Sequence, residues 1–61
     1  MTIEKQILHQ EHIIALNEGL LYACETFNYP QEDKNGLLDN LSFAYQILKT
    51  LKQVKENDNT P

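Results

Sequence analysis

One break divides the chain into two stretches with a helical pattern, and it limits the fold more than any other feature. The break consists of Asn28, Tyr29 and Pro30. A residue before a proline is pushed out of helical geometry, so Tyr29 should be extended and the first helix should end near Phe27 or Asn28. Asparagine also tolerates the left-handed conformation that often closes a helix. The sequence therefore predicts a helix of about residues 2–27, followed by a turn.

The first stretch has an apolar band that covers about half of the helix circumference. Its members at helical spacing are Ile3, Ile7, Ile14 and Leu21, with Ile13, Leu20 and Phe27 on an adjacent line. Thr2 can act as the N-cap, and Glu4 in the first turn suits the positive end of the helix dipole. These features are typical of an amphipathic helix.

The second stretch predicts a helix of about residues 30–55, followed by a disordered polar tail of residues 56–61. Pro30 suits the first position of a helix, and acidic residues follow it directly. A start after Asn35 is the alternative, because Asn35 and Gly36 form a typical turn pair. With the start at Pro30, Gly36 lies inside the helix and weakens it by about 1 kcal/mol relative to alanine. The apolar residues follow a spacing of four and three: Leu37, Leu41, Ala44, Leu48 and Leu51.

The two helices should pair as an all-α, antiparallel hairpin that makes residues 1–61 a single unit. Folding back at the break places Ile7 opposite Leu51 and Ile14 opposite Ala44. A chain of 61 residues has no room for a second domain, a nucleotide-binding βαβ pair or a barrel enzyme.

A hairpin of this size should not remain alone, because each helix touches only one neighbour while apolar residues flank both sides of its core line. Two hairpins that form a four-helix bundle with two-fold symmetry would cover these residues. We therefore expect a homodimer, and the sequence leaves the relative direction of its two hairpins open. The predicted dimer core consists of Ile7, Ile14, Leu21, Leu37, Leu41, Leu48 and Leu51.

Polar residues interrupt the apolar line and border it. Gln10 and Asn17 lie on the apolar line of the first helix, where amides that pair across an interface can fix the register and the number of partners. Beside this line, every seventh residue from Glu4 to Glu32 is a glutamate. Such a row is usually a solvated flank that keeps a helix soluble, although it could also present a negative face to a basic partner.

The reactive side chains show no pattern typical of catalysis or of a cofactor site. His9 and His12 have a spacing that some zinc sites use, but two side chains do not complete a tetrahedral site, and Cys24 lies more than three turns away. We find no activated nucleophile, no paired acid and base and no glycine-rich phosphate loop. The sequence thus predicts neither an enzyme nor a cofactor nor a metal site.

Composition favours a small cytoplasmic protein. Apolar runs such as Ile13–Leu16 are far shorter than the roughly 20 residues that span a bilayer, and the N-terminus lacks the pattern of a secretion signal. Cys24 is the single cysteine and cannot form an internal disulfide, which indicates a reducing compartment. The abundance of Ile, Asn, Lys and Gln without any Arg suits a bacterial or phage genome.

The candidate partner contacts lie at the break and near the end of the second helix. Tyr29 is an aromatic residue that could anchor a protein partner. Lys49, Lys52 and Lys55 complement the helix dipole, and they could also meet RNA phosphates. Because the net charge is −4 and no arginine is present, nucleic acid is the less favoured partner. We expect a non-enzymatic regulator that binds a protein; the alternatives are an RNA-binding four-helix bundle that uses these lysines and a structural subunit of a larger assembly.

In length and hairpin layout, the chain is similar to small plasmid copy-number proteins, which dimerise into four-helix bundles and bind RNA loops. It shares no motif with them, so this resemblance implies an architecture and assigns no residue. Its size also resembles that of bacterial sporulation phosphatase hairpins, whose second helix has a serine four residues before an aspartate. Here Gln46 follows Ser42 at that spacing, which removes the phosphatase chemistry.

Overall fold

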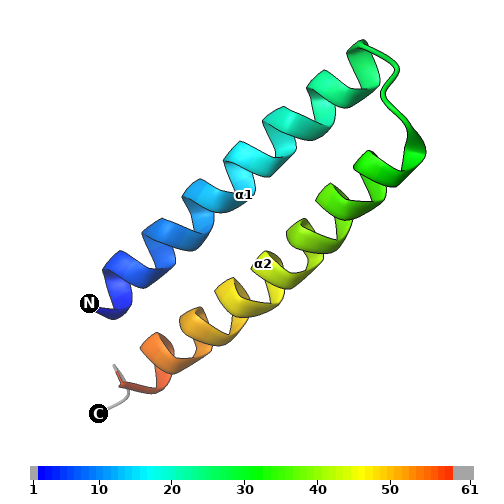
Figure 1. Cartoon of the computed structure of the whole chain (residues 1–61). Coiled ribbons are helices and arrows are strands. Elements are labelled where there is room, and N and C mark those ends of the chain that lie inside the picture. The colour runs from blue at the N-terminus through cyan, green and yellow to red at the C-terminus, as the bar shows by residue number, and fades with distance from the viewer. Residues whose placement is uncertain (1, 59–61) are drawn as a thin grey trace.

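The computed structural model describes residues 2–58 and shows two helices, α1 (Ile3–Thr26) and α2 (Gln31–Asp58). They run antiparallel and pack against each other, so that the start of α1 and the end of α2 lie opposite the turn (Figure 1). The hairpin measures 51 Å by 15 Å by 15 Å. The prediction of an all-helical chain with two packed helices is confirmed for the described residues.

The first turn of α1 is capped as its sequence predicts. Thr2 has an extended backbone, and its hydroxyl oxygen accepts a hydrogen bond from the backbone N–H of Lys5 at 3.2 Å. Glu4 lies in the same turn. The side chain of Thr2 thereby satisfies a backbone donor that has no partner within the helix.

A left-handed asparagine closes α1. Asn28 has a φ of 56° and follows Phe27, the C-cap. The N–H of Asn28 donates to the carbonyl of Glu25 at 3.4 Å, and the N–H of Tyr29 donates to the carbonyl of Cys24 at 2.9 Å. This pair of bonds is the Schellman arrangement, which ends a helix and redirects the chain.

The second helix begins at Gln31, directly after the proline, so the alternative start after Asn35 is wrong and Pro30 precedes the first helical residue. The carbonyl of Pro30 accepts hydrogen bonds from the N–H groups of Asp33 at 3.1 Å and Lys34 at 3.5 Å. Gly36 consequently lies inside α2, where an added Cβ would meet nothing within 4 Å.

The C-terminal end of α2 differs from the prediction. Residues 56–58 are helical, so the prediction of a disordered tail from residue 56 is wrong for these three residues. They are polar but include no proline or glycine, and helical hydrogen bonding can continue through such residues without an apolar contact. The remainder of the predicted tail, residues 59–61, lies outside the described residues.

The core of the hairpin is small. Ile14, Leu41 and Ala44 form its buried cluster, and Ile13, Leu21 and Leu48 pack against them. Cys24 is the other buried hydrophobic residue among those described. Of the predicted dimer core, Ile14 and Leu41 are thus buried in the single hairpin, and the others are partly buried: Ile7, Leu21, Leu37, Leu48 and Leu51. Their part in a dimer stays a prediction.

Candidate functional site

The surface of the hairpin is unusually rich in large apolar side chains. Among residues 2–58, four hydrophobic residues are buried, whereas ten large ones are exposed. The exposed ones are Leu8, Leu16, Leu20, Tyr22, Phe27, Tyr29, Leu38, Phe43, Tyr45 and Val54. Exposed apolar side chains typically mark a site of interaction when they are contiguous, so their arrangement on the two helices decides whether they form such a site.

The line of contact between the helices divides the surface into two broad faces. Side chains seven residues apart lie on nearly the same side of a helix, so each helix has two flanks beside the contact line. The hydroxyl of Tyr45 donates to Oε2 of Glu18 at 3.4 Å, which places these flanks of α1 and α2 on one face. On the opposite face, Ile13 and Ile47 line the same hollow.

We call the first of these surfaces the charged face. It comprises the glutamate row of α1 together with interspersed apolar and basic residues: Glu4, Glu11, Glu18, Glu25, Leu8, Tyr22, Leu38, Tyr45, Lys49 and Lys52. We call the opposite surface the apolar face. It comprises Ile13, Leu16, Leu20, Phe27, Phe43, Ile47 and Val54.

Three neighbouring hollows lie along the apolar face. A hollow of about 310 Å³ between the helices is lined by Ile13, Phe43 and Ile47. It shares Asn40 with a hollow of about 460 Å³ nearer the turn, and it shares Ile47 with one of about 280 Å³ on α2. We call these three neighbouring hollows together the furrow; they follow one another from the turn towards the open end.

Formal charge is almost absent from this furrow. Among the described residues, the charged side chains that line its three hollows are Glu32 and Asp33, and both lie at the end nearest the turn. Its other polar lining includes the amides of Gln10, Asn17 and Asn40. The furrow is therefore suited to apolar contacts with a few neutral hydrogen bonds.

The two polar residues predicted to specify register both lie in this furrow. Gln10 and Asn17 are partly buried and line its central hollow. The amide of Asn17 donates to the carbonyl of Ile13 on its own helix, at 2.8 Å. A role of either residue in fixing register stays a prediction, since its test requires a second chain.

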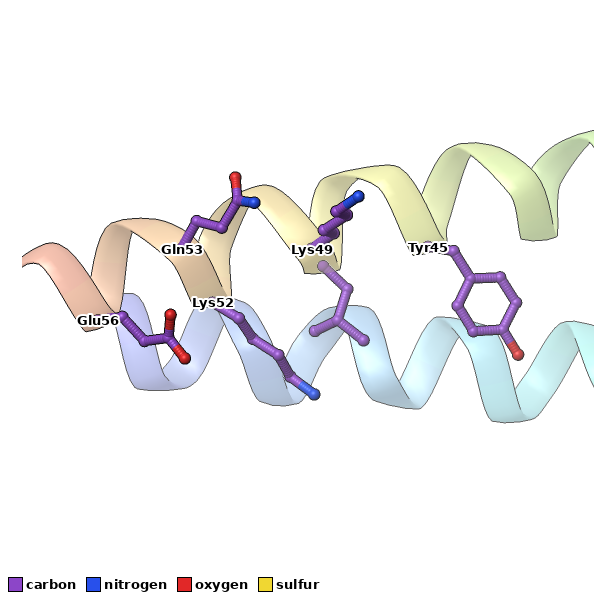
Figure 2. Close-up of a pocket in the computed structure, with 6 residues that line it drawn as sticks. Tyr45, Lys49, Lys52, Gln53 and Glu56 are labelled. Carbon is purple, nitrogen blue, oxygen red and sulfur yellow. The ribbon is translucent and has the colours of Figure 1, made fainter.

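The three lysines predicted as a possible partner contact lie in two different environments, one exposed and one partly buried. Lys49 and Lys52 are exposed and line a hollow of about 410 Å³ on the charged face, together with Tyr45 and Glu56 (Figure 2). In that view, Lys52 extends across towards α1, whereas Lys49 points away from it (Figure 2). Lys55 is partly buried and lies on the contact line at helical spacing from Leu48. The three lysines therefore do not form one exposed basic patch.

Tyr29, the predicted aromatic contact, lies at the turn end of the hairpin. Its side chain is half exposed and lines the same hollow as Leu20, Cys24 and Leu37. It borders the apolar face rather than projecting alone from the turn.

The remaining chemistry-bearing residues are not gathered in one place. His9 and His12 are both exposed, and Cys24 is a buried free thiol. In the described part of the chain, no three His, Cys, Asp or Glu side chains are grouped so that they could hold a metal ion. Neither α1 nor α2 combines the length and the apolar character that crossing a membrane requires.

The sequence predictions did not assign Leu16 or Phe43 to any site, although both are exposed on the apolar face. Their signal was present in the spacing: Leu16 follows Ile13 by three residues, and Phe43 precedes Ile47 by four. This spacing assigns Leu16 and Phe43 to one surface only when the pairing of the helices shows which flanks of α1 and α2 share a face.

Comparisons of the chain with protein-family models, with curated proteins and with solved structures found no match.

Proposed function

We propose that this chain is a small, non-enzymatic regulatory protein that works as a homodimeric helical hairpin and binds a protein partner. The observation that carries the proposal is the imbalance between ten exposed large apolar side chains and four buried hydrophobic residues among those described. Two hairpins packed as a four-helix bundle would remove many of these side chains from water, and burial of apolar surface is the dominant driving force for association.

The charge pattern supports a protein partner over RNA. Lys49 and Lys52 share their hollow with the carboxylate of Glu56, and Lys55 is partly buried. The chain as a whole has a net charge of −4 and contains no arginine. RNA binding depends on clustered positive charge that neutralises phosphates, so a protein surface is the better supported partner.

Sedimentation velocity of the purified chain at micromolar concentration tests the proposed assembly. We expect a species of twice the 7.1 kDa chain mass. A stably folded species with the mass of one chain at these concentrations would contradict the homodimer.

Capture of partners by the tagged full chain from its native host, with and without ribonuclease, tests the partner class. We expect a captured protein that remains bound after ribonuclease treatment and at moderately raised salt. Captured RNA that is lost as salt rises would contradict a protein partner, because phosphate contacts weaken steeply with salt. It would instead support the alternative function through Lys49, Lys52 and Lys55.

A further inference from the structure

We infer that a second copy of this chain covers the apolar face, and that the charged face remains outside the dimer. This inference rests on the proposed homodimer and specifies which of the two broad surfaces forms it. The surface is centred on the furrow between the helices and includes Leu16, Leu20, Phe43 and Ile47.

The position of the exposed apolar side chains favours this face. Leu16 and Phe43 are each more than half exposed, and Leu20 is nearly so. Ile13 and Ile47 lie between them and are only partly covered by the hairpin itself. A helix from a second copy that lies along the furrow would complete the burial of both isoleucines and cover the side chains beside them.

The area of the face matches the requirement of a stable dimer. The projected area of one side of the hairpin, 51 Å by 15 Å, is of the same order as the roughly 800 Å² of accessible surface that each partner buries in stable interfaces. A partner that covers the whole length of the furrow would therefore bury enough surface, and a hairpin of the same length meets that condition.

The distribution of charge favours a second copy as the occupant. In a two-fold symmetric interface, each surface meets the same surface of the other chain. A dimer through the charged face would bury four glutamates but only two lysines from each copy. The apolar face carries formal charge only at its turn end among the described residues, at Glu32 and Asp33. Its neutral amides have both donors and acceptors, so each can pair with an amide of the other copy.

The exposed apolar residues of the charged face are less suited to form an interface with a second copy. Leu8 and Tyr22 lie on α1 beside the row of glutamates, at helical spacing from Glu4 and Glu18. Tyr45 already contacts Glu18 through its hydroxyl. Burial of this face against an identical one would take four glutamates of each copy out of water against only Lys49 and Lys52. Some carboxylates would then lack an oppositely charged partner, which is strongly unfavourable.

A matched pair of charge substitutions tests the inference. Phe43 on the apolar face and Leu8 on the charged face are almost equally exposed in the hairpin, at 67% and 66%. Phe43→Glu should weaken dimerisation at least about a hundredfold, because the dimer would bury an unpaired carboxylate from each copy. Leu8→Glu should leave the dimer dissociation constant within about threefold, since its side chain stays in water. Sedimentation across a range of concentrations measures both.

The inference is overturned when Phe43→Glu dimerises as tightly as the wild-type chain, or when both variants lose dimerisation equally. A wild-type chain that sediments as a folded monomer contradicts the homodimer and this inference together. A dimeric wild-type chain with an unaffected Phe43→Glu variant contradicts the assignment of the face alone.

Fluorescence decides the case in which Phe43→Glu does not fold. The chain has no tryptophan, so Phe43→Trp and Tyr22→Trp each introduce a single reporter that preserves aromatic character. The uncharged quencher acrylamide should quench the Phe43→Trp variant at least about threefold less than the Tyr22→Trp variant at concentrations where the chain is dimeric, because an interface core excludes water. Equal quenching of the two variants would show that the apolar face remains open to solvent and would overturn the inference.

Discussion

At the scale of single residues, local chemistry decides where the helices begin and end. Thr2 caps α1 through its hydroxyl, Asn28 takes the left-handed conformation, and Pro30 provides the first carbonyl acceptor of α2. Each of these roles depends on atoms within five residues along the chain, which is why the sequence alone predicts them. A role of Asn17 in fixing register cannot be derived from local chemistry in the same way. Its amide donates to the carbonyl of Ile13 on its own helix, and any contact with an amide of a second chain depends on how that chain packs.

Substitution of Asn28 tests the closure of α1. Asn28→Ala should lower the free energy of unfolding by about 1 kcal/mol, because a side chain with a Cβ and no compensating local polar group is strained at positive φ. Asn28→Gly should match or exceed the wild-type stability, because glycine adopts this conformation without strain. Urea unfolding at one fixed protein concentration measures both variants. Equal stability of the alanine and glycine variants would contradict the role assigned to the left-handed turn.

At the scale of the elements, the apolar repeat predicts where the helices lie more reliably than where the second one ends. The spacing of leucines along α2 stops at Leu51, and a helix predicted from burial should end soon afterwards. The helix instead continues through residues 56–58, because Glu56 and Asn57 interrupt neither the backbone hydrogen bonding nor the geometry. Apolar periodicity predicts which residues of a helix pack against the other helix. It does not predict how far a polar helix end extends into solvent.

Substitution of the two glycines by alanine tests whether both helices are continuous there and have space for a methyl group. Gly36 in α2 and Gly19 in α1 have nothing within 4 Å of an added Cβ, and neither has a positive φ. Gly36→Ala and Gly19→Ala should each raise the free energy of unfolding by about 1 kcal/mol, because alanine restricts the unfolded chain and favours helix. Thermal unfolding followed by circular dichroism measures the change. A loss of stability with Gly19→Ala would contradict the helical conformation of α1 at this position.

At the scale of the whole molecule, the pairing of the helices separates an apolar from a charged surface. The sequence predicts the seam, since Ile14, Leu41 and Ala44 follow a repeat that is visible in each helix. It does not directly show which flank of α1 shares a face with which flank of α2. That relation depends on contacts between residues distant in sequence, such as the bond between Tyr45 and Glu18, which are 27 residues apart. The furrow and its few charges therefore emerge only from the assembled hairpin.

The central claim is that a hairpin with so small a core shares its apolar surface with a second copy of itself. Urea unfolding of the wild-type chain at about 1 µM and about 100 µM tests this claim directly, because association with the folded state makes stability depend on protein concentration. We predict a higher urea midpoint at the higher concentration, corresponding to about 2.7 kcal/mol per mole of dimer for a hundredfold change. A cooperative transition with the same midpoint at both concentrations would contradict the claim.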